Sequence, residues 1–256
     1  MLKLGWFSTG RGPGSRNLLN TVAAAIVRGE IDARIQYVFS NREPGEARGS
    51  DQFFSLVKRL GLHLVCYSSR KFKRGWAGER GPWRVAYDRE VMRRLDGFSP
   101  HLCVLAGYML IIGPQMCSRY TLINLHPAAP GGPEGTWQEV IWKLIGQGAT
   151  HSGVKVHLVT EELDKGPTIS FCTYPVRGGA FDPYWSAVSG VSVEELKAEK
   201  GEELPLFKLI RREGARRELP LILETLKALA DGRARVDRAR PIEPRDLTTT
   251  IENAIS

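Results

Sequence analysis

The sequence lacks any apolar run long enough to cross a membrane. Its longest strongly apolar stretch, residues 104–112, is broken by Gly107 and falls well short of the roughly 20 residues that a transmembrane helix needs. The first residues, 1–7, lead directly into a glycine-rich turn and are too few for the apolar core of a signal peptide. We therefore expect a globular, cytoplasmic protein with no membrane partner.

Cysteine is scarce, and its spacing does not suggest metal binding. The four residues lie far apart in the sequence, at Cys66, Cys103, Cys117 and Cys172. No Cys-x-x-Cys pair is present, so a zinc site is not expected. Buried free thiols in a reducing compartment explain this usage, and we predict no bound metal.

Negative charge is also in short supply. The chain has 36 Lys and Arg against 28 Asp and Glu, for a formal net charge of +8. A basic balance favours anionic partners such as phosphates, carboxylates or nucleic acid, but it does not choose among them. The 256 residues, 42% of them hydrophobic, suffice for one sizeable core in a single large domain or a domain with an appendage.

Strand-like and helical patterns alternate in the first half of the chain. The strand-like stretches are residues 2–8, 33–40, 62–67, 101–106 and 122–125, and helical spacing of apolar residues marks 18–26, 53–60 and 87–95. The stretch 101–106 is apolar on both faces, as a central parallel strand should be. This alternation predicts an α/β fold with a doubly wound, mostly parallel sheet and helices on both faces.

The second half follows a different pattern. Two strand-like stretches, 154–160 and 168–176, are separated by a short connection, so at least one of them should run antiparallel. Helical spacing returns over 204–229, where Gly214 and Pro220 are expected to break or kink the helix. The charged, proline-containing end of the chain is expected to form a loose or packed appendage.

Three polar residues stand at the ends of predicted strands. Asn124 and His126 are two positions apart, so their side chains should share one face, and ligands of open α/β sheets bind beyond the carboxyl ends of strands. Asp164 follows the strand-like stretch 154–160, where its carboxylate could orient an imidazole and raise its pKa. Such a trio could hold a carbonyl oxygen while an amine attacks its carbon. Each residue could also simply close a turn, and the spacing alone leaves both readings open.

A glycine-rich turn, residues 10–15, separates the first predicted strand from the first predicted helix. Free N–H groups at a helix start, together with the positive end of the helix dipole, suit a phosphate. The turn fits neither G-x-G-x-x-G nor G-x-x-x-x-G-K-[ST], so a nucleotide cofactor of those two kinds is disfavoured.

Together these motifs resemble those of the folate-dependent formyltransferases. The matching stretches are Asn124-Leu125-His126-Pro127, residues 156–167, the glycine-serine turn, and residues 38–41, 86–90, 105–109 and 230–233. The likeness runs in order through residues 1–235 and is greatest to the members that formylate glycinamide ribonucleotide in purine biosynthesis. It implies a Rossmann-like, doubly wound and mostly parallel seven-stranded sheet. Segments near 70–83 and 181–203 look like insertions, and residues 236–256 form a C-terminal tail.

The resemblance also implies an enzyme that uses 10-formyltetrahydrofolate as formyl donor. Asn124, His126 and Asp164 would be catalytic: the amide and a protonated imidazole would stabilise the oxyanion, and the carboxylate would help to move the proton of the amine through water. The donor would be bound by Met109, Leu110, Ile111, His157, Val159, Thr160 and Glu161. The phosphate of the acceptor would be bound by Gly12, Gly14 and Ser15, with Arg84 as a helper.

The expected pockets depart from the family pattern, so the acceptor stays open. The loop after Pro127 is one residue shorter than usual, and the asparagine of the phosphate turn is displaced to Asn17. We expect a phosphorylated small-molecule amine, with glycinamide ribonucleotide first. The alternatives are a sugar-nucleotide amine, water (a formyltetrahydrofolate hydrolase), or a folate-binding protein without turnover.

The basic and aromatic stretch 70–76 has a composition that can bind single-stranded nucleic acid. A solvated loop explains it better, so nucleic acid is not expected as a partner. Formylation of a tRNA would require a separate C-terminal barrel domain, which does not fit in what remains after residue 205. A homodimer stays open.

Overall fold

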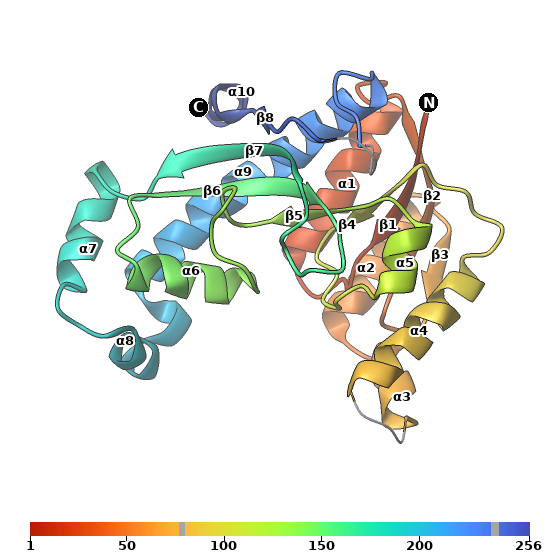
Figure 1. Ribbon diagram of the computed structural model, residues 1–256, viewed down its shortest axis with the longest axis horizontal. Coiled ribbons are helices and arrows are strands. Elements are labelled where there is room, and N and C mark those ends of the chain that lie inside the picture. Colours follow the sequence, from red (N-terminus) through yellow and green to blue (C-terminus); the bar gives the residue numbers. More distant parts are fainter. Residues whose placement is uncertain (77–79, 237–240) are drawn as a thin grey trace.

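The computed structural model describes residues 1–76, 80–236 and 241–256, with the side chains of residues 80–82 left out. Within these residues, eight strands form one sheet in the order β3-β2-β1-β4-β5-β6-β7-β8 (Figure 1). The strands are β1 (Leu2–Phe7), β2 (Ala33–Ser40), β3 (Leu64–Cys66), β4 (Leu102–Leu105), β5 (Leu122–His126), β6 (His151–Leu158), β7 (Thr168–Pro175) and β8 (Arg245–Asp246). The helices are α1 (Pro13–Val27), α2 (Arg48–Arg59), α3 (Ser69–Arg74), α4 (Arg80–Arg94), α5 (Pro114–Arg119), α6 (Trp137–Gly146), α7 (Asp182–Ala187), α8 (Val193–Glu199), α9 (Pro205–Ala230) and α10 (Thr248–Ile255).

The first five strands are parallel, as their alternation with helices predicts. β1 pairs with β2 and β4, β2 with β3, and β4 with β5, all in parallel. β6 then runs antiparallel to both β5 and β7. The mostly parallel, doubly wound sheet is confirmed, with eight strands in place of seven because β8 pairs in parallel with β7.

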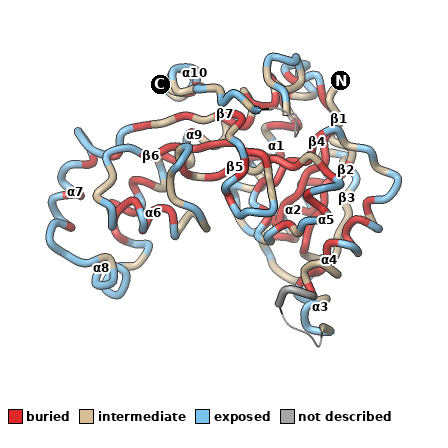
Figure 2. Tube along the Cα trace, in the orientation of Figure 1, coloured by how far each residue is buried: buried red, intermediate tan, exposed pale blue. Residues whose placement is uncertain are grey.

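Helices cover both faces of the sheet. Leu4 and Trp6 of β1 point into the core that lies beneath α1, α2 and α9, whereas Phe7 points into the core beneath α4 and α5. Figure 2 shows buried residues concentrated along the strands between these layers. The alternation of the side chains of one strand between two cores is the physical basis of the three-layer arrangement.

A smaller core lies at the far end of the sheet. There α6, α7, α8 and the first half of α9 pack around Trp142 and Phe207, whose rings lie 4.9 Å apart. The segment 181–203, which was expected to be an insertion, supplies α7, α8 and a short 3₁₀ turn at 201–203, and another short 3₁₀ turn at 179–181 leads into it. It therefore extends the core of the fold around α6.

The long C-terminal helix was expected to break or kink at Gly214 and Pro220, and the break is wrong. α9 runs without interruption from Pro205 to Ala230, through both Gly214 and Pro220. An interior proline costs about 3 kcal/mol, but the apolar side chains Leu221, Ile222 and Leu226 follow it and lie in the main core. Their burial outweighs the local cost.

The solvated loop expected at residues 70–76 is also wrong for most of its length, because residues 69–74 form α3. Ser68 caps this helix by accepting a hydrogen bond from the main-chain N–H of Lys71 at 3.0 Å. The centre of the Phe72 ring lies 5.9 Å from the centre of the Tyr67 ring and 5.5 Å from the centre of the Tyr87 ring. Residues 77–79 of the expected insertion lie outside the described residues.

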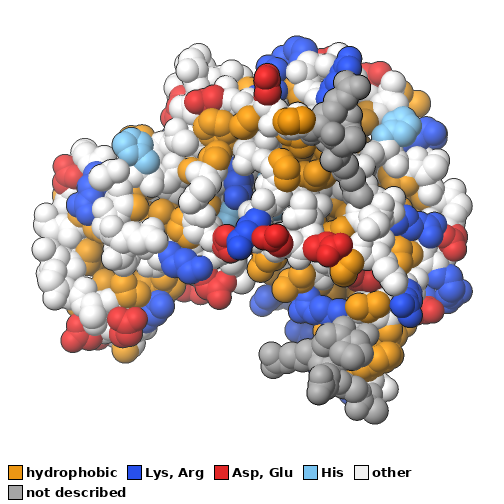
Figure 3. Space-filling model, in the orientation of Figure 1, with side chains coloured by type: hydrophobic (Ala, Val, Ile, Leu, Met, Phe, Trp, Pro, Cys, Tyr) orange, Lys and Arg blue, Asp and Glu red, His pale blue; other side chains and the backbone are white. Residues whose placement is uncertain are grey.

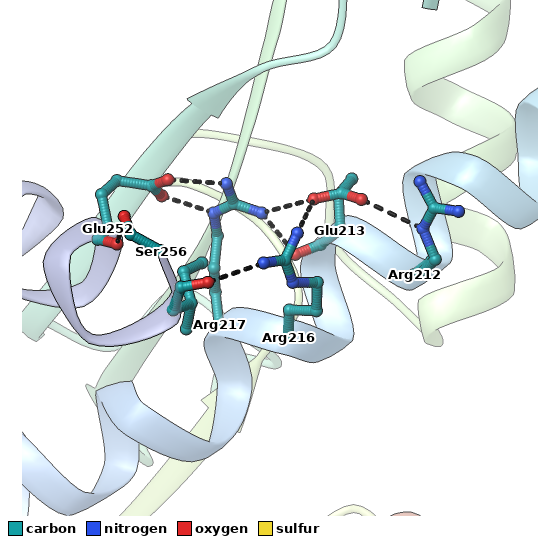
Figure 4. Close-up of polar contacts among 7 residues, drawn as sticks. Arg212, Glu213, Arg216, Arg217, Glu252 and Ser256 are labelled. Atoms are coloured by element: carbon teal, nitrogen blue, oxygen red, sulfur yellow. Dashed lines mark hydrogen bonds and ion pairs between the residues drawn. The ribbon is translucent and has the colours of Figure 1, made fainter. Parts of the chain in front are cut away.

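The C-terminal tail packs against the rest of the fold. Ile251 of α10 is fully buried in the main core. Arg217 of α9 donates two hydrogen bonds to the carboxylate of Glu252, at 2.6 and 2.9 Å, and one to the carbonyl of Glu213 at 2.7 Å (Figure 4). Arg216 donates to the carbonyl of Ile255 at 2.8 Å. The end of the chain is thus fixed to α9 by charge as well as by apolar packing.

Two further features bear on the expectations from composition. All four cysteines are free, and three of them are buried. No helix in the described part of the chain has the length and apolar character needed to span a membrane.

Candidate functional site

Four polar side chains share one face of the antiparallel pair β5–β6. In the register of the two strands, Asn124 lies opposite His157, and His126 lies opposite Lys155. Residues two positions apart on a strand point to the same face, so the four side chains form a two-by-two array. The opposite face of β6 carries Val154 and Val156 and belongs to the main core.

Asp164, from the loop between β6 and β7, completes this polar array. Its Oδ2 lies 3.6 Å from Nδ1 of His126, and its Oδ1 lies 3.6 Å from Nε2 of His157. The main-chain N–H of Gly135 donates to Oδ2 at 3.2 Å. Both histidines are 2% exposed and Asp164 is 9% exposed, so these interactions are largely shielded from water.

The loop that carries Asp164 has an unusual backbone. Asp164 has φ +56° and is the one non-glycine residue with a positive φ in the described ranges. Such a conformation costs on the order of 1–3 kcal/mol and persists only where the surroundings hold it. At Gly166 a Cβ would lie 1.7 Å from the carbonyl oxygen of Leu158, so only glycine allows the loop to return this closely to β6.

Both ring nitrogens of His126 face acceptors, yet burial keeps its pKa below the ordinary value. Nε2 lies 2.9 Å from the carbonyl oxygen of Pro133, which can only accept, so Nε2 carries a hydrogen. Nδ1 faces the Asp164 carboxylate, which also accepts. Burial lowers the pKa of His126 and outweighs the Pro133 carbonyl and Asp164, which act in the opposite direction, so the pKa increase expected from the carboxylate is wrong.

The carboxyl group of Asp164 is held in its ionised form. Burial alone would raise its pKa, but contacts with His157 and His126 and the hydrogen bond from Gly135 outweigh burial and hold the pKa below its usual value. A carboxylate is therefore available beside both imidazoles at neutral pH.

The Asn124 amide lies beside the ring of His157. Nδ1 of His157 lies 3.0 Å from the carbonyl oxygen of Leu158 and must donate to it. Nε2 of His157 faces Nδ2 of Asn124 at 3.3 Å and Oδ1 of Asp164 at 3.6 Å. The Asn124 amide therefore stands at the same nitrogen of His157 as the Asp164 carboxylate.

The predicted phosphate turn opens α1. Gly12 is the N-cap with no side-chain hydrogen bond, Pro13 follows it, and the first turn contains no acidic residue. A Cβ at Gly12 or Gly14 would meet nothing within 4 Å. Ser15 lies against the end of β4, since a Cβ at Gly107 would lie 2.6 Å from its hydroxyl. The uncapped N–H groups of this helix suit an anion.

Hydrogen bonds join this turn to the stretch predicted to bind the donor. The main-chain N–H of Thr9 donates to the carbonyl of Gly107 at 3.0 Å, and that of Met109 donates to the Thr9 hydroxyl at 2.9 Å. Asn124 pairs with Leu105 in the sheet. The glycine turn, the end of β4 and the polar array therefore meet along the carboxyl ends of β1, β4 and β5, where the order of the strands reverses.

The residues predicted to bind the donor fall into two groups. Met109 and Ile111 are about half exposed, at 49% and 47%, while Leu110 and Val159 pack against the core beneath α4 and α5. His157 lies within the polar array. In the loop after β6, Thr160 donates to the carbonyl of Glu162 and Glu161 is exposed.

Basic side chains lie near the predicted binding sites. Arg84, predicted to help with the phosphate, donates to the carbonyl of Ile111 at 3.4 Å and so lies beside the predicted donor stretch. Figure 3 shows this side of the molecule hollowed between the lobe of α6–α8 and that of α3 and α4, with Lys and Arg side chains gathered on the second lobe.

In the part of the chain that the structure describes, no group of three or more His, Cys, Asp or Glu side chains is arranged to hold a metal ion.

Lys155 also belongs to the polar array, although it was not predicted from the sequence as a site residue. This residue is 5% exposed, and its ammonium donates to the main-chain carbonyl of Asp164 at 3.1 Å. The signal was present, because Lys155 is two positions before His157 in a predicted strand and must share its face.

Comparison with known proteins places the chain in a family. The sequence profile described as "Formyl transferase" matches residues 13–177. Phosphoribosylglycinamide formyltransferase of Escherichia coli (strain K12) is 38% identical over 168 residues, which are 65% of this chain and 71% of that protein. Formyltetrahydrofolate deformylase of Haemophilus influenzae is 28% identical over 149 residues, which are 55% of this chain and 44% of that protein.

Solved structures of similar proteins have the same fold. Glycinamide ribonucleotide transformylase 1 from Symbiobacterium toebii matches with a TM-score of 0.63 and 21% identity over 93% of this chain and 92% of that one. The corresponding protein from Geobacillus kaustophilus has a TM-score of 0.60 and 25% identity over 90% and 99% of the two chains. The profile covers more than half of the sequence, including β5 and the loop that carries Asp164, and on that ground this chain belongs to the formyl transferase family.

Proposed function

We propose that this protein transfers a formyl group from 10-formyltetrahydrofolate to the primary amine of a phosphorylated small molecule, and that this acceptor is glycinamide ribonucleotide. The observation that carries the proposal is the Asp164 carboxylate between His126 and His157, on the same face as Asn124. The E. coli relative, named phosphoribosylglycinamide formyltransferase, supports the choice of acceptor.

Asn124 and His126 stabilise the oxyanion in different ways. As the amine attacks, negative charge develops on the formyl oxygen; an N–H of Asn124 donates to this oxygen, and the positive charge of a protonated His126 ring lies beside it. One such hydrogen-bond donor lowers the barrier by about 3–4 kcal/mol. Developing negative charge also raises the pKa of His126, which offsets the lowering by burial.

Asp164 moves the proton of the amine. Its low pKa keeps it ionised, and a carboxylate can take the proton directly or through one water molecule as the new C–N bond forms. His126 can return a proton to the leaving nitrogen of the donor. A positioned acid or base contributes about 10²–10⁴-fold in rate.

Binding of the two substrates follows from the surroundings of the array. Met109 and Ile111 expose apolar side chains beside the end of β4, which suits the flat ring of a folate. The uncapped start of α1 suits the phosphate of the acceptor. Both sites lie along the sheet edge that carries Asn124, which would bring the amine and the formyl carbon together.

The test is the rate of formyl-donor loss, followed by absorbance, with each of several acceptors. We expect rapid loss with glycinamide ribonucleotide and only slow loss with glycinamide riboside, which lacks the phosphate. Faster donor loss with a sugar-nucleotide amine than with glycinamide ribonucleotide would identify the sugar-nucleotide amine as the acceptor. Donor binding without loss across the whole panel would contradict enzymatic transfer and favour a folate-binding protein.

Hydrolysis of the donor is the second candidate, and the likeness to the H. influenzae deformylase favours it. The same array can activate water in place of an amine. Release of free formate at the full rate without any amine would identify a hydrolase, whereas transfer requires that the amine raise the rate.

A further inference from the structure

Lys155 is an unusual residue for the middle of a sheet. It lies in β6 between His126 of β5 and Phe171 of β7 and is 5% exposed. Lysine is almost never buried to this extent unless its ammonium is paired. Burial lowers the pKa of Lys155, while the carboxylates of Asp164 and Glu134 oppose that effect.

The hydrogen bond of Lys155 goes to the main chain at the strained position. Nζ donates to the carbonyl oxygen of Asp164 at 3.1 Å, the residue with φ +56°. The ends of the surrounding loop are closed by the bond from the N–H of Leu158 to the carbonyl of Pro167 at 2.9 Å. Lys155 thus contacts the main chain of this closed loop from the sheet.

We infer that Lys155 is a positioning residue for formyl transfer, whose ammonium holds the main chain of Asp164 in the left-handed conformation that directs its carboxylate between His126 and His157. The inference rests on the proposed function and adds a residue to its machinery. The bond is made to the main chain of Asp164, so Lys155 acts on the position of the carboxylate without occupying either of the oxygens that face the histidines.

The charged groups around Lys155 fit this role. Asp164 and Glu134 attract its ammonium, and its charge in turn lowers the pKa of His126. Without the ammonium, the carbonyl of Asp164 would lose its donor inside a buried site, which is unfavourable. The left-handed backbone persists only where its surroundings hold it, so loss of the bond can release the loop.

The first test compares Lys155→Met with Lys165→Met, an exposed residue of the same loop whose ammonium lies 3.7 Å from Glu162. We expect kcat to fall about 10- to 100-fold in Lys155→Met, with KM for donor and acceptor changed less than about threefold, and Lys165→Met to match the wild type. Lys155→Arg should recover part of kcat. A change confined to KM would overturn the inference.

The second test asks whether Lys155 acts through Asp164. In an Asp164→Asn background, adding Lys155→Met should reduce kcat by less than about twofold, because residues that act as a unit are not additive. Full multiplication of the two effects would contradict the inference.

A crystal structure of Lys155→Met separates failure of this inference from failure of the proposed function, since it needs no turnover. We expect the left-handed conformation of Asp164 to be lost, or its carboxylate to move away from the histidines. An unchanged Asp164 in that crystal would overturn the positioning role, whether or not the wild type transfers formyl groups.

Discussion

The Asp164 carboxylate lies 3.6 Å from Nδ1 of His126 and, through its other oxygen, 3.6 Å from Nε2 of His157. One carboxylate thus serves two imidazoles that stand on adjacent antiparallel strands. The arrangement requires a loop that returns close to β6 and a backbone that turns the carboxylate toward the sheet. Gly166 and the left-handed Asp164 supply these two features.

Replacement of Asp164 by asparagine tests the need for its charge. Asp164→Asn keeps the size of the side chain and can still accept from Gly135, but it cannot take a proton from an amine. We expect kcat to fall about 10²–10⁴-fold with little change in the unfolding temperature. Asp182→Asn in α7 is the matched control and should retain full activity; equal activity of the two variants would remove Asp164 from the mechanism.

The titration of His126 tests the electrostatics of the array. Burial lowers its pKa, so an NMR titration should give a value below the ordinary 6.5. In Asp164→Asn the value should fall further, because the attraction of the carboxylate is lost. Because the pKa of His126 is lower in the folded wild type than in the unfolded chain, the unfolded chain binds more protons at this residue between the two pKa values. His126 therefore makes the protein more stable as pH rises from the folded pKa towards about 6.5. A value above the ordinary one would show that the carboxylate outweighs burial.

Gly166 tests the close return of the loop. A Cβ there would lie 1.7 Å from the carbonyl of Leu158, so Gly166→Ala must displace the loop and with it Asp164. We expect at least about a 10-fold loss of kcat. Gly75 has φ −81° and room for a Cβ, with its nearest neighbour at 3.7 Å. Gly75→Ala should therefore leave kcat unchanged, and an unimpaired Gly166→Ala would show that the loop is more adaptable than its geometry indicates.

Arg217 tests how firmly the C-terminal helix is attached. Its guanidinium contacts Glu252 and Glu213 (Figure 4). It also lies 4.2 Å from the centre of the Tyr174 ring. Arg217→Ala should lower the free energy of unfolding by about 2–3 kcal/mol, measured by urea denaturation. Arg212→Ala, which removes an exposed partner of Glu213, should change it by less than about 0.5 kcal/mol; similar losses in both would mean that burial of Arg217 is unimportant.

The parts of the fold that follow from local rules were predictable. Alternation of apolar strands and helical stretches gave the parallel half of the sheet, and the i, i+2 rule placed Asn124 and His126 on one face. The turn at Asp164 was recognisable as a strand end. The distance between the Asp164 carboxylate and the His126 ring depends on how β5 and β6 pair. Neither residue by itself specifies that pairing.

The errors arose where distant packing overrides local preference. Gly214 and Pro220 disfavour a helix, yet the apolar residues beyond them lie in the main core and α9 continues. The basic stretch at 70–74 resembles a solvated loop, but Phe72 packs between two tyrosine rings and a helix forms. Lys155 was overlooked because a lysine is ordinarily exposed, and only its pairing with Asp164 makes its burial acceptable.

The most direct measurement is formyl-donor loss with glycinamide ribonucleotide, compared among the wild type, Asn124→Ala and His126→Ala, with Asn20→Ala and His151→Ala as matched exposed controls. We expect rapid loss for the wild type and both controls. For each site variant we expect a fall of about 10²–10³-fold, while circular dichroism shows that each remains folded. Wild-type rates in both Asn124→Ala and His126→Ala would rule out catalysis by this pair.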